Sequence, residues 1–552
     1  MKNNIQTLYD CWEKLYAKHK FQLLDDFVNE LGQYKTKNNS QPLEHLWYKD
    51  VVVYSLYVNL FNETFDGLAT KLDYLEQLGI NCLWLLPVLE SPMRDGGFDV
   101  SDYRNIRKSL CSVDGHISSE EAQKQFAEFM ALAHKRGFKI IFDLPLNHCS
   151  DEHIWFKAAK NNDKTFKNYF IWSENDKKFA DARIIFKGIE ESNWHKCDDE
   201  YYFHRFFEFQ PDLNYKNPKV LLEITRIFIH WLQLGVDGFR ADAIPYLWKE
   251  NNTNCENLEG THIILQFIKS VIDHIRPNTL LLAEACQKPD ELARYFDKAD
   301  ECNAAYHFPL MPMIFKSIAL QSREPIISIL NNNSAPEISE ESQWFLFLRC
   351  HDELSLEHVY VSEDDRKFLH NHYCRDLCWD FRSGEGIAAR LSELLNFDEK
   401  KILLAYSILL SLRGTPIIFY GDEFAKSNDT AFYNEQIAIT GKNDTRFLTR
   451  GKIDWLDVEQ QLADKESLAS KVFAGLSKMI AVRSAHKAFG RGSIECLDVG
   501  NDAILAYFRV YEGEKIVVLH NLSEVSQSFS VEGIADNMIA PFATQFVHLA
   551  VK

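Results

Sequence analysis

Residues 236–243 read VDGFRADA, a short apolar run that ends in an arginine and an aspartate. Lys139–His148 (KIIFDLPLNH) has the same form. Apolar runs of this length, separated by helix-length segments, are typical of parallel strands buried on both faces. The pattern recurs at Val51–Val58, Asn81–Val88, Leu280–Ala285, Ala304–Met311, Trp344–Asp352 and Thr415–Glu423. Eight such runs predict an α/β fold, a (β/α)8 TIM barrel rather than an open sheet.

The regions outside these runs predict three attachments to the barrel. We expect the catalytic barrel to occupy residues 47–148 and 214–490. Residues 149–213 lack the repeat and are rich in Asn, Asp, Lys and aromatics, which indicates an inserted loop-rich domain after the third strand. An insertion there lies beside the active face of a barrel, where it can close a pocket. Residues 1–46 predict a polar helical extension, and residues 491–552 predict a small antiparallel β domain.

Composition excludes several classes of function. The chain has 552 residues and a net charge of −19, which disfavours a nucleic-acid partner because such a partner requires a basic face. No uncharged apolar stretch is long enough to span a membrane, and the N-terminus lacks the pattern of a secretory signal. The twelve scattered cysteines predict free thiols in a reducing compartment, so we expect a cytoplasmic location. The oligomeric state is left open.

Polar residues gather where the predicted strands end. Barrel enzymes place their working groups at the carboxyl ends of strands. Here those positions hold Asp143, Asn147, His148, Arg240, Asp242, Glu284, His351 and Asp352. Two carboxyl groups on either side of a glycosidic bond are the requirement for glycoside hydrolysis or transfer. Arg240 points to the same side of its strand as Asp242 and would hold Asp242 ionised, while a protonated Glu284 would donate to the leaving oxygen.

The same strand ends carry motifs that resemble the α-amylase family. The motifs are DLPLNH (143–148), GFRAD (238–242), AEA around Glu284 and HDE (351–353), with QPDLN (210–214) and GGFDVSDY (96–103) between or before them. They occur in the order and spacing of the family, and the resemblance covers about residues 47–490. It implies a retaining enzyme that forms a covalent β-glucosyl intermediate.

The resemblance also implies a role for individual residues. Asp242 would be the nucleophile, Glu284 the general acid/base, and Asp352 the residue that steadies the transition state by holding sugar hydroxyls. The substrate-binding residues that it implies are Phe98, Asp99, His148, Arg240, His351 and Arg390. Phe98 would stack on the glucosyl unit, Asp99 would bind the far edge of that unit, and Arg390 would pair with Asp99.

Several longer segments resemble the trehalose synthase group, whose members isomerise maltose to trehalose. The segments are Asp181–Phe186, Ile244–Leu247, Thr253–Leu258, Thr261–His262 and His307–Pro312. This likeness implies a small α-glucoside substrate. Cys286 and Cys350 stand where the group has asparagine, and Asp444–Arg446 lies where it has another segment. An α-glucosidase or α-amylase-type hydrolase therefore remains an alternative. An inactive barrel scaffold is disfavoured because all three carboxylates are retained.

One position of a family metal site is also changed. Relatives are expected to hold calcium with Asn147, Asp181, the carbonyls of Tyr246 and Leu247, and a glutamate where this chain has Lys249. An ammonium group cannot ligate calcium, but it can take the place of the cation and pair with Asp181. The other interpretation is that Lys249 points to solvent. The sequence predicts no metal and no other cofactor, with bound calcium as the alternative.

Overall fold

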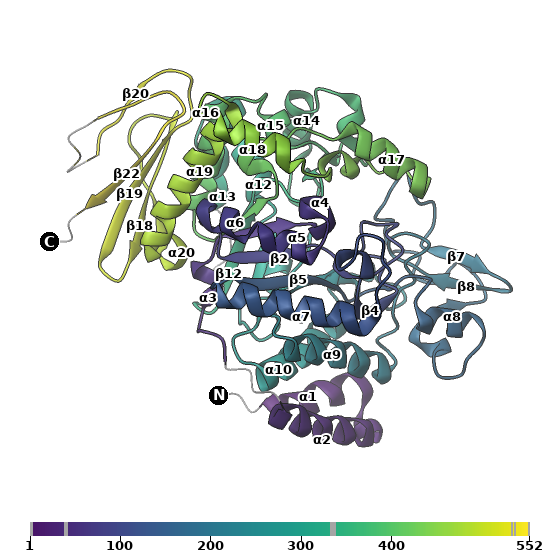
Figure 1. The fold of residues 1–552 in the computed structure, drawn as a ribbon. Coiled ribbons are helices and arrows are strands. Elements are labelled where there is room, and N and C mark those ends of the chain that lie inside the picture. The colour runs from purple at the N-terminus through teal and green to yellow at the C-terminus, as the bar shows by residue number, and fades with distance from the viewer. Residues whose placement is uncertain (1–3, 38–41, 332–337, 532–533, 535–536, 550–552) are drawn as a thin grey trace.

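Eight parallel strands close into a barrel at the centre of the molecule (Figure 1). In order around the barrel they are β1 (Val53–Leu56), β2 (Cys82–Leu85), β5 (Lys139–Pro145), β9 (Gly238–Asp242), β10 (Leu280–Ala283), β11 (Ala304–Tyr306), β12 (Gln343–Phe347) and β16 (Thr415–Phe419). Every neighbouring pair is parallel, and β16 closes the ring against β1. Each strand overlaps one of the eight predicted runs, so the predicted TIM barrel is confirmed.

The structure is a computed structural model that describes residues 4–37, 42–331, 338–531, 534 and 537–549. Short parts of the predicted N-terminal extension and of the predicted C-terminal domain lie outside the described residues. The same holds for residues 332–337 within the predicted barrel.

Helices surround the barrel because each carries one apolar face. They include α4 (Val58–Asn62), α5 (Phe65–Thr70), α6 (Leu72–Leu78), α7 (Ser119–Lys135), α9 (Pro218–Gln233), α10 (Glu259–Ile275), α12 (Leu310–Leu320), α16 (Glu399–Ser411) and α19 (Leu468–Ala485). In α9, Asn217 caps the first turn, Pro218 follows at the first helical position, and Trp231 packs on Phe142 of β5 with ring centroids 5.1 Å apart. Such contacts fix each helix to its strand.

Shorter elements occupy the chain before the first barrel strand, the loops between barrel strands and the chain after the barrel. The helices are α3 (Trp47–Asp50), α11 (Pro289–Ala293), α13 (Glu324–Asn331), α14 (Glu363–Tyr373), α15 (Leu391–Leu394), α17 (Thr430–Thr440), α18 (Trp455–Ala463) and α20 (Lys487–Arg491). The strands are β3 (Leu89–Glu90), β4 (Asp102–Ile106), β13 (Leu354–Ser355), β14 (Asp380–Phe381) and β15 (Gly386–Ile387).

The segment inserted after β5 contains more regular structure than its composition predicts. It holds α8 (Ile154–Lys160) and an antiparallel sheet of β6 (Trp172–Ser173), β8 (Glu200–Phe203) and β7 (Trp194–Cys197). Its last residues return to the barrel, where His148 and Asp212 form an isolated bridge. The insertion lies on the side of the barrel opposite the C-terminal sheet (Figure 1).

The C-terminal region is an antiparallel sheet, as predicted from the sequence. β17 (Ser493–Cys496), β18 (Ile504–Tyr511), β19 (Glu514–Asn521) and β22 (Thr544–Leu549) form it in that order, beside a small pair of β20 (Gln527–Ser528) and β21 (Met538–Ile539). Arg509 of β18 is fully buried and donates to the carbonyl oxygens of Ser411, Ala488 and Gly492. These charge-assisted bonds fasten the sheet to α16 and α20.

The N-terminal extension is a helical hairpin that packs on the barrel. α1 (Asn4–Tyr16) and α2 (Phe21–Lys37) lie against α10 (Figure 1). Trp12 is fully buried with its ring 6.1 Å from that of Phe267, and the Tyr16 hydroxyl donates to the Tyr215 carbonyl at 2.7 Å. The hairpin therefore shares the core of the barrel.

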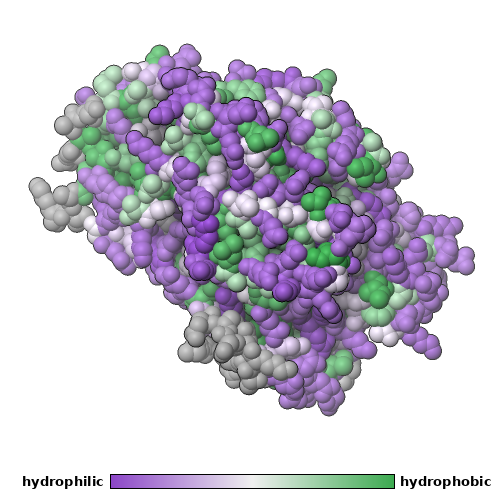
Figure 2. All heavy atoms as spheres, viewed as in Figure 1, coloured by the Kyte–Doolittle hydropathy of each residue, from purple (hydrophilic) through white to green (hydrophobic). Residues whose placement is uncertain are grey.

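Hydrophilic side chains cover most of the face drawn in Figure 2, where hydrophobic residues form small separate groups. Within the described ranges, no helix is long and apolar enough to cross a membrane. All twelve cysteines are unpaired, as predicted.

We expect replacement of Trp12 by Ala to lower the free energy of unfolding by about 3–5 kcal/mol, because it opens a cavity against α10. Urea denaturation followed by circular dichroism measures the change. Lys14→Ala, at an exposed position of the same helix, should stay within about 0.5 kcal/mol of the parent. Equal stability of the two variants would contradict a shared core.

Candidate active site

A pocket lies at the carboxyl ends of the barrel strands and brings most of the predicted site residues together. Those that line it are Phe98, His148, Arg240, Asp242, Glu284, His351 and Asp352. Aromatic side chains form much of the remaining wall, namely Trp84, Phe186, Phe206, Tyr246, Tyr306, Phe308, Phe347 and Phe381. A wall of aromatic rings with a few convergent polar groups is suited to a sugar ring, which has apolar faces and hydroxyls at its rim.

Arg240 fixes the acidic groups of two neighbouring strands. Its Nη1 donates to Asp242 Oδ1 at 2.7 Å and to Asp143 Oδ1 at 2.6 Å. Asp143 Oδ2 also accepts from Trp84 Nε1 at 3.0 Å. Arg240 and Asp242 share one side of β9 because side chains alternate along a strand. The Arg240 side chain is 3% exposed, so water screens its attraction to Asp242 only weakly. The ion pair therefore holds the carboxylate of Asp242 in one orientation.

Glu284 follows β10 and shares the same guanidinium. Its Oε2 accepts from the backbone N–H of Ala243 at 2.9 Å, and its Oε1 lies 3.9 Å from Arg240 Nη2. Burial raises the pKa of Glu284, and burial likewise raises the pKa of Asp242, against the charge of Arg240. Arg240 is closer to Asp242 than to Glu284, so a single negative charge on the pair is more stable on Asp242.

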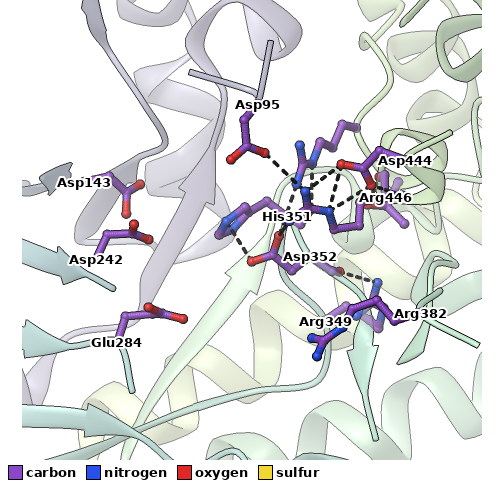
Figure 3. A network of polar contacts seen from close by, with 12 residues as sticks. Asp95, Asp143, Asp242, Glu284, Arg349, His351, Asp352, Arg382, Asp444 and Arg446 are labelled. Carbon is purple, nitrogen blue, oxygen red and sulfur yellow. Dashed lines mark hydrogen bonds and ion pairs between the residues drawn. The ribbon is translucent and has the colours of Figure 1, made fainter. Parts of the chain in front are cut away.

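Asp352 faces these two carboxyl groups from the other side of the pocket (Figure 3). Its Oδ1 accepts from Arg446 Nη1 at 3.0 Å and Arg450 Nη2 at 3.1 Å, and its Oδ2 lies 3.0 Å from His351 Nε2. Against the effect of burial, His351 and the two arginines hold the pKa of Asp352 well below its ordinary value. Asp352 is therefore a carboxylate at neutral pH, able to accept hydrogen bonds.

His148 and His351 present uncharged rings to the pocket. Burial lowers the pKa of each histidine to about 4. His148 Nε2 and His351 Nδ1 are buried and have no hydrogen-bond partner within the described part of the chain. The ring of His351 stacks on Phe98 with centroids 5.3 Å apart. The two histidine rings can therefore hydrogen-bond a neutral ligand without adding charge to the site.

The predicted contact between Asp99 and Arg390 is wrong, and neither residue lines the pocket. Asp99 accepts from the Ser91 hydroxyl at 2.9 Å and from the backbone of Arg94 and Asp95, so it stabilises its own turn. Arg390 is fully buried and donates to the Tyr420 carbonyl and to Asp422, at 3.3 Å in the second case. Both are structural residues behind the pocket wall.

A different pair of an acidic residue and an arginine, Asp95 and Arg446, is found in the pocket. Arg446 Nη2 lies 3.2 Å from Asp95 Oδ1, and both side chains line the pocket. Arg446 is itself held by Asp444, at 2.9 Å from its Nε. Burial raises the pKa of Asp95 to about 7. The signals available in the sequence were the position of Asp95, three residues before Phe98, and the Asp444–Arg446 segment, to which no role had been assigned.

Lys249 lies in the position where the family comparison predicts calcium. Its Nζ is 2.8 Å from Asp212 Oδ2 and 2.7 Å from Asn147 Oδ1, and its side chain is 3% exposed. The solvent-facing interpretation is therefore wrong. Pairing with Asp181 is also wrong, because Asp181 is exposed and Asp212 of the QPDLN motif takes its place. This donor set does not fit calcium, since an ammonium group already neutralises its oxygens. The lack of any metal stays a prediction.

Comparisons with known proteins agree with this geometry. Residues 59–492 match the family described as "Alpha amylase, catalytic domain". A trehalose synthase of Thermus thermophilus is 38% identical over 520 residues, which are 89% of this chain and 52% of that protein, so the chain spans about half of its length. A trehalose synthase/amylase of Mycobacterium tuberculosis is 36% identical over 528 residues, 89% of this chain and 84% of the relative.

Among solved structures, the α-amylase from H. orenii superposes with a TM-score of 0.70 at 22% identity, over 91% of this chain and 99% of the other. At that identity the likeness concerns the fold alone. The chain belongs to the α-amylase family and, within it, to the group of the trehalose synthases. The family resemblance predicted from the motifs is confirmed.

We expect Lys249→Met to lower the free energy of unfolding by about 3–5 kcal/mol, because it leaves Asp212 buried without a counter-charge. Lys219→Met, at an exposed position of α9, serves as the control. Lys249→Glu restores an acidic ligand, so added calcium should raise the melting temperature of that variant and leave the parent unchanged. Differential scanning fluorimetry with calcium and with EDTA measures both effects. Stabilisation of the parent by calcium would contradict the assignment.

Proposed function

We propose that this chain is a retaining α-glucosyl isomerase that interconverts maltose-type and trehalose-type disaccharides. Asp242 attacks the anomeric carbon while Glu284 donates its proton to the glycosidic oxygen, which leaves as free glucose. The released glucose rotates inside the pocket. Glu284 then removes a proton from a different hydroxyl, which attacks the anomeric carbon and expels Asp242. Two displacements retain the α configuration.

The contacts of each residue support its role in this reaction. Arg240 holds Asp242 as the anion that attacks, and the raised pKa of Glu284 keeps a proton available to the leaving group. Asp352, kept ionised by Arg446, would accept hydrogen bonds from the hydroxyls of the glucosyl unit. Phe98 provides an aromatic wall for that unit.

The observation that favours isomerisation over hydrolysis is a chain of ion pairs at one side of the pocket. We assign this side, the acceptor end, to the released glucose. Glu357 and Arg382 line the pocket together with Asp242, and Arg382 Nη1 donates to Glu357 Oε1 at 2.9 Å. Arg183 of the inserted domain reaches Glu357 Oε2 at 3.5 Å and Glu256 Oε1 at 2.9 Å. The insertion is thereby fastened to barrel loops beside the pocket, which restrains escape of glucose and the arrival of water.

A second contact joins the insertion to the barrel on the same side. Lys442, after α17, lies 3.1 Å from both Glu190 and Glu208. Both acidic residues belong to the inserted domain. Two separate ion-pair groups therefore restrain its movement relative to the pocket. The names of the relatives, trehalose synthase and trehalose synthase/amylase, agree with the proposed reaction.

Hydrolysis of maltose or short α-glucans is the second candidate. Cys286 favours it, because its thiol lines the pocket near Glu284 and makes a weak contact of 3.7 Å with the Tyr360 hydroxyl. A thiol holds a sugar hydroxyl less firmly than an amide does.

We also propose a cytoplasmic location. The twelve free thiols support it, because free thiols are typical of a reducing compartment.

Anomer-resolved NMR of the products from maltose and from trehalose tests the proposal. Interconversion of the two sugars with little free glucose is the expected result. Mainly free glucose, released first as the α-anomer, would identify a retaining hydrolase instead. No turnover of either sugar would contradict isomerisation and would leave hydrolysis of short α-glucans as the candidate.

The two catalytic carboxyl groups predict distinct kinetic effects. Asp242→Ala should abolish turnover, and Glu284→Gln should lower kcat by about 10²–10⁴-fold. Because the pKa of Glu284 is raised, the parent loses activity on the alkaline side only as pH rises above the ordinary range of a glutamate. Glu284→Gln should lose this alkaline fall, which a pH profile of kcat/KM measures. Unchanged melting temperatures serve as the control, and an alkaline fall retained in Glu284→Gln would contradict the role.

Opening the acceptor end should change the products rather than the first displacement. We expect Arg183→Ala to raise the ratio of free glucose to isomerised disaccharide several-fold, because it removes the link from the insertion to Glu357. NMR of the products measures this ratio. Arg294→Ala, at a surface ion pair with 51% exposure, is the matched control. An unchanged ratio in Arg183→Ala would show that the ion-pair chain does not retain glucose.

A further inference from the structure

Two histidines face each other far from the active pocket, where the C-terminal sheet meets the end of the barrel. His486 joins α19 to α20, and His548 lies on β22, the last strand of the sheet. Their Nε2 atoms are 3.2 Å apart and their ring centroids 4.3 Å apart. In Figure 1 the C-terminal sheet lies beside α19 and α20. Nothing in the proposed reaction uses this pair.

Glu514 orients one of the two rings. It begins β19, the strand that pairs with β22, and its Oε1 lies 2.6 Å from His486 Nδ1. Glu514 Oε2 accepts from the backbone N–H of Ala488 at 3.3 Å, which holds the carboxylate in place. A neutral His486 that donates from Nδ1 to Glu514 presents the lone pair of Nε2 to His548. Carboxylate–histidine pairs of this kind support metal-binding histidines in proteins.

We infer that His486 and His548 bind one transition-metal ion of the zinc class through their Nε2 atoms, with Glu514 as the residue that orients His486. Two imidazole nitrogens bound at 2.0–2.1 Å to a tetrahedral Zn²⁺ are separated by roughly 3.3 Å. The observed 3.2 Å matches this separation, and binding requires the two rings, now 4.3 Å apart at their centroids, to tilt apart so that both Nε2 lone pairs point at the ion. Water would complete the coordination, because the His548 side chain is exposed.

The chemistry of the donors selects the class of ion. Imidazole nitrogen suits Zn²⁺, Ni²⁺ and Cu²⁺, whereas calcium and magnesium prefer oxygen ligands. In the absence of metal, the same geometry holds a single proton between the two rings as a hydrogen bond. Binding of the ion requires that proton to leave Nε2: it moves to Nδ1 when the His548 ring is neutral, and to solvent when that ring is protonated. The ion would link the last strand of the C-terminal sheet to the helix that leaves the barrel.

Isothermal titration of the full-length, chelator-treated chain with ZnCl2, in a buffer that does not bind metal, tests this inference. The parent is expected to bind one ion. His548→Ala should weaken binding by more than tenfold, and Glu514→Gln by about 10–100-fold, the usual effect of losing such an orienting partner. His195→Ala, at an exposed histidine of β7, is the matched control and should bind like the parent.

Two further measurements separate this site from the group Cys350, His351 and Asp352 in the active pocket, whose ligand atoms lie within 4.8 Å of one another. Zinc at the proposed site should leave turnover unchanged, and X-ray absorption should show imidazole nitrogen without sulfur. Zinc should also raise the melting temperature of the parent but not of His548→Ala. A sulfur ligand, equal zinc affinity of the parent and His548→Ala, or no binding by the parent would overturn the inference.

Discussion

The active pocket depends on the guanidinium of Arg240. This single buried cation lies between Asp143 and Asp242 and also approaches Glu284. Without it, three acidic groups would share a dry pocket, and each would hold its proton to avoid the cost of burial. With it, one carboxyl group can stay ionised while its neighbour stays protonated. The proposed roles, attack by Asp242 and proton transfer by Glu284, therefore rest on the asymmetric position of Arg240.

The pocket also depends on a second cation on the opposite side. Arg446 joins Asp352 to Asp95 and is held in turn by Asp444, so its charge is shared among three carboxylates (Figure 3). Both arginines line the pocket. Arg240 belongs to barrel strand β9, whereas Arg446 belongs to the segment after the last barrel strand. In the proposed reaction, the substrate would therefore bind among fixed charges of the protein.

The sequence predicted the barrel and the identity of the central residues because both follow from local patterns. Strands buried on both faces appear as short apolar runs, and groups at strand ends must converge. It did not predict which way side chains in loops point. Asp99 and Asp95 lie in the same short loop, yet only Asp95 enters the pocket, and Arg390 pairs with Asp422 rather than with Asp99. Likewise Lys249 contacts Asp212 instead of Asp181, a choice set by how the insertion folds back.

Lys249 gives the junction between the barrel and the inserted domain an unusual property. A bound ion has a finite dissociation constant, so the occupancy of its site changes with the concentration of that ion. The ammonium group of Lys249 is covalently part of the chain and is present once in every copy, whatever the composition of the surroundings. The contacts of Lys249 with Asp212 and Asn147 are therefore independent of chelators, of dilution and of competition among divalent ions. A substitution at position 249, by contrast, removes this charge from every copy of the protein.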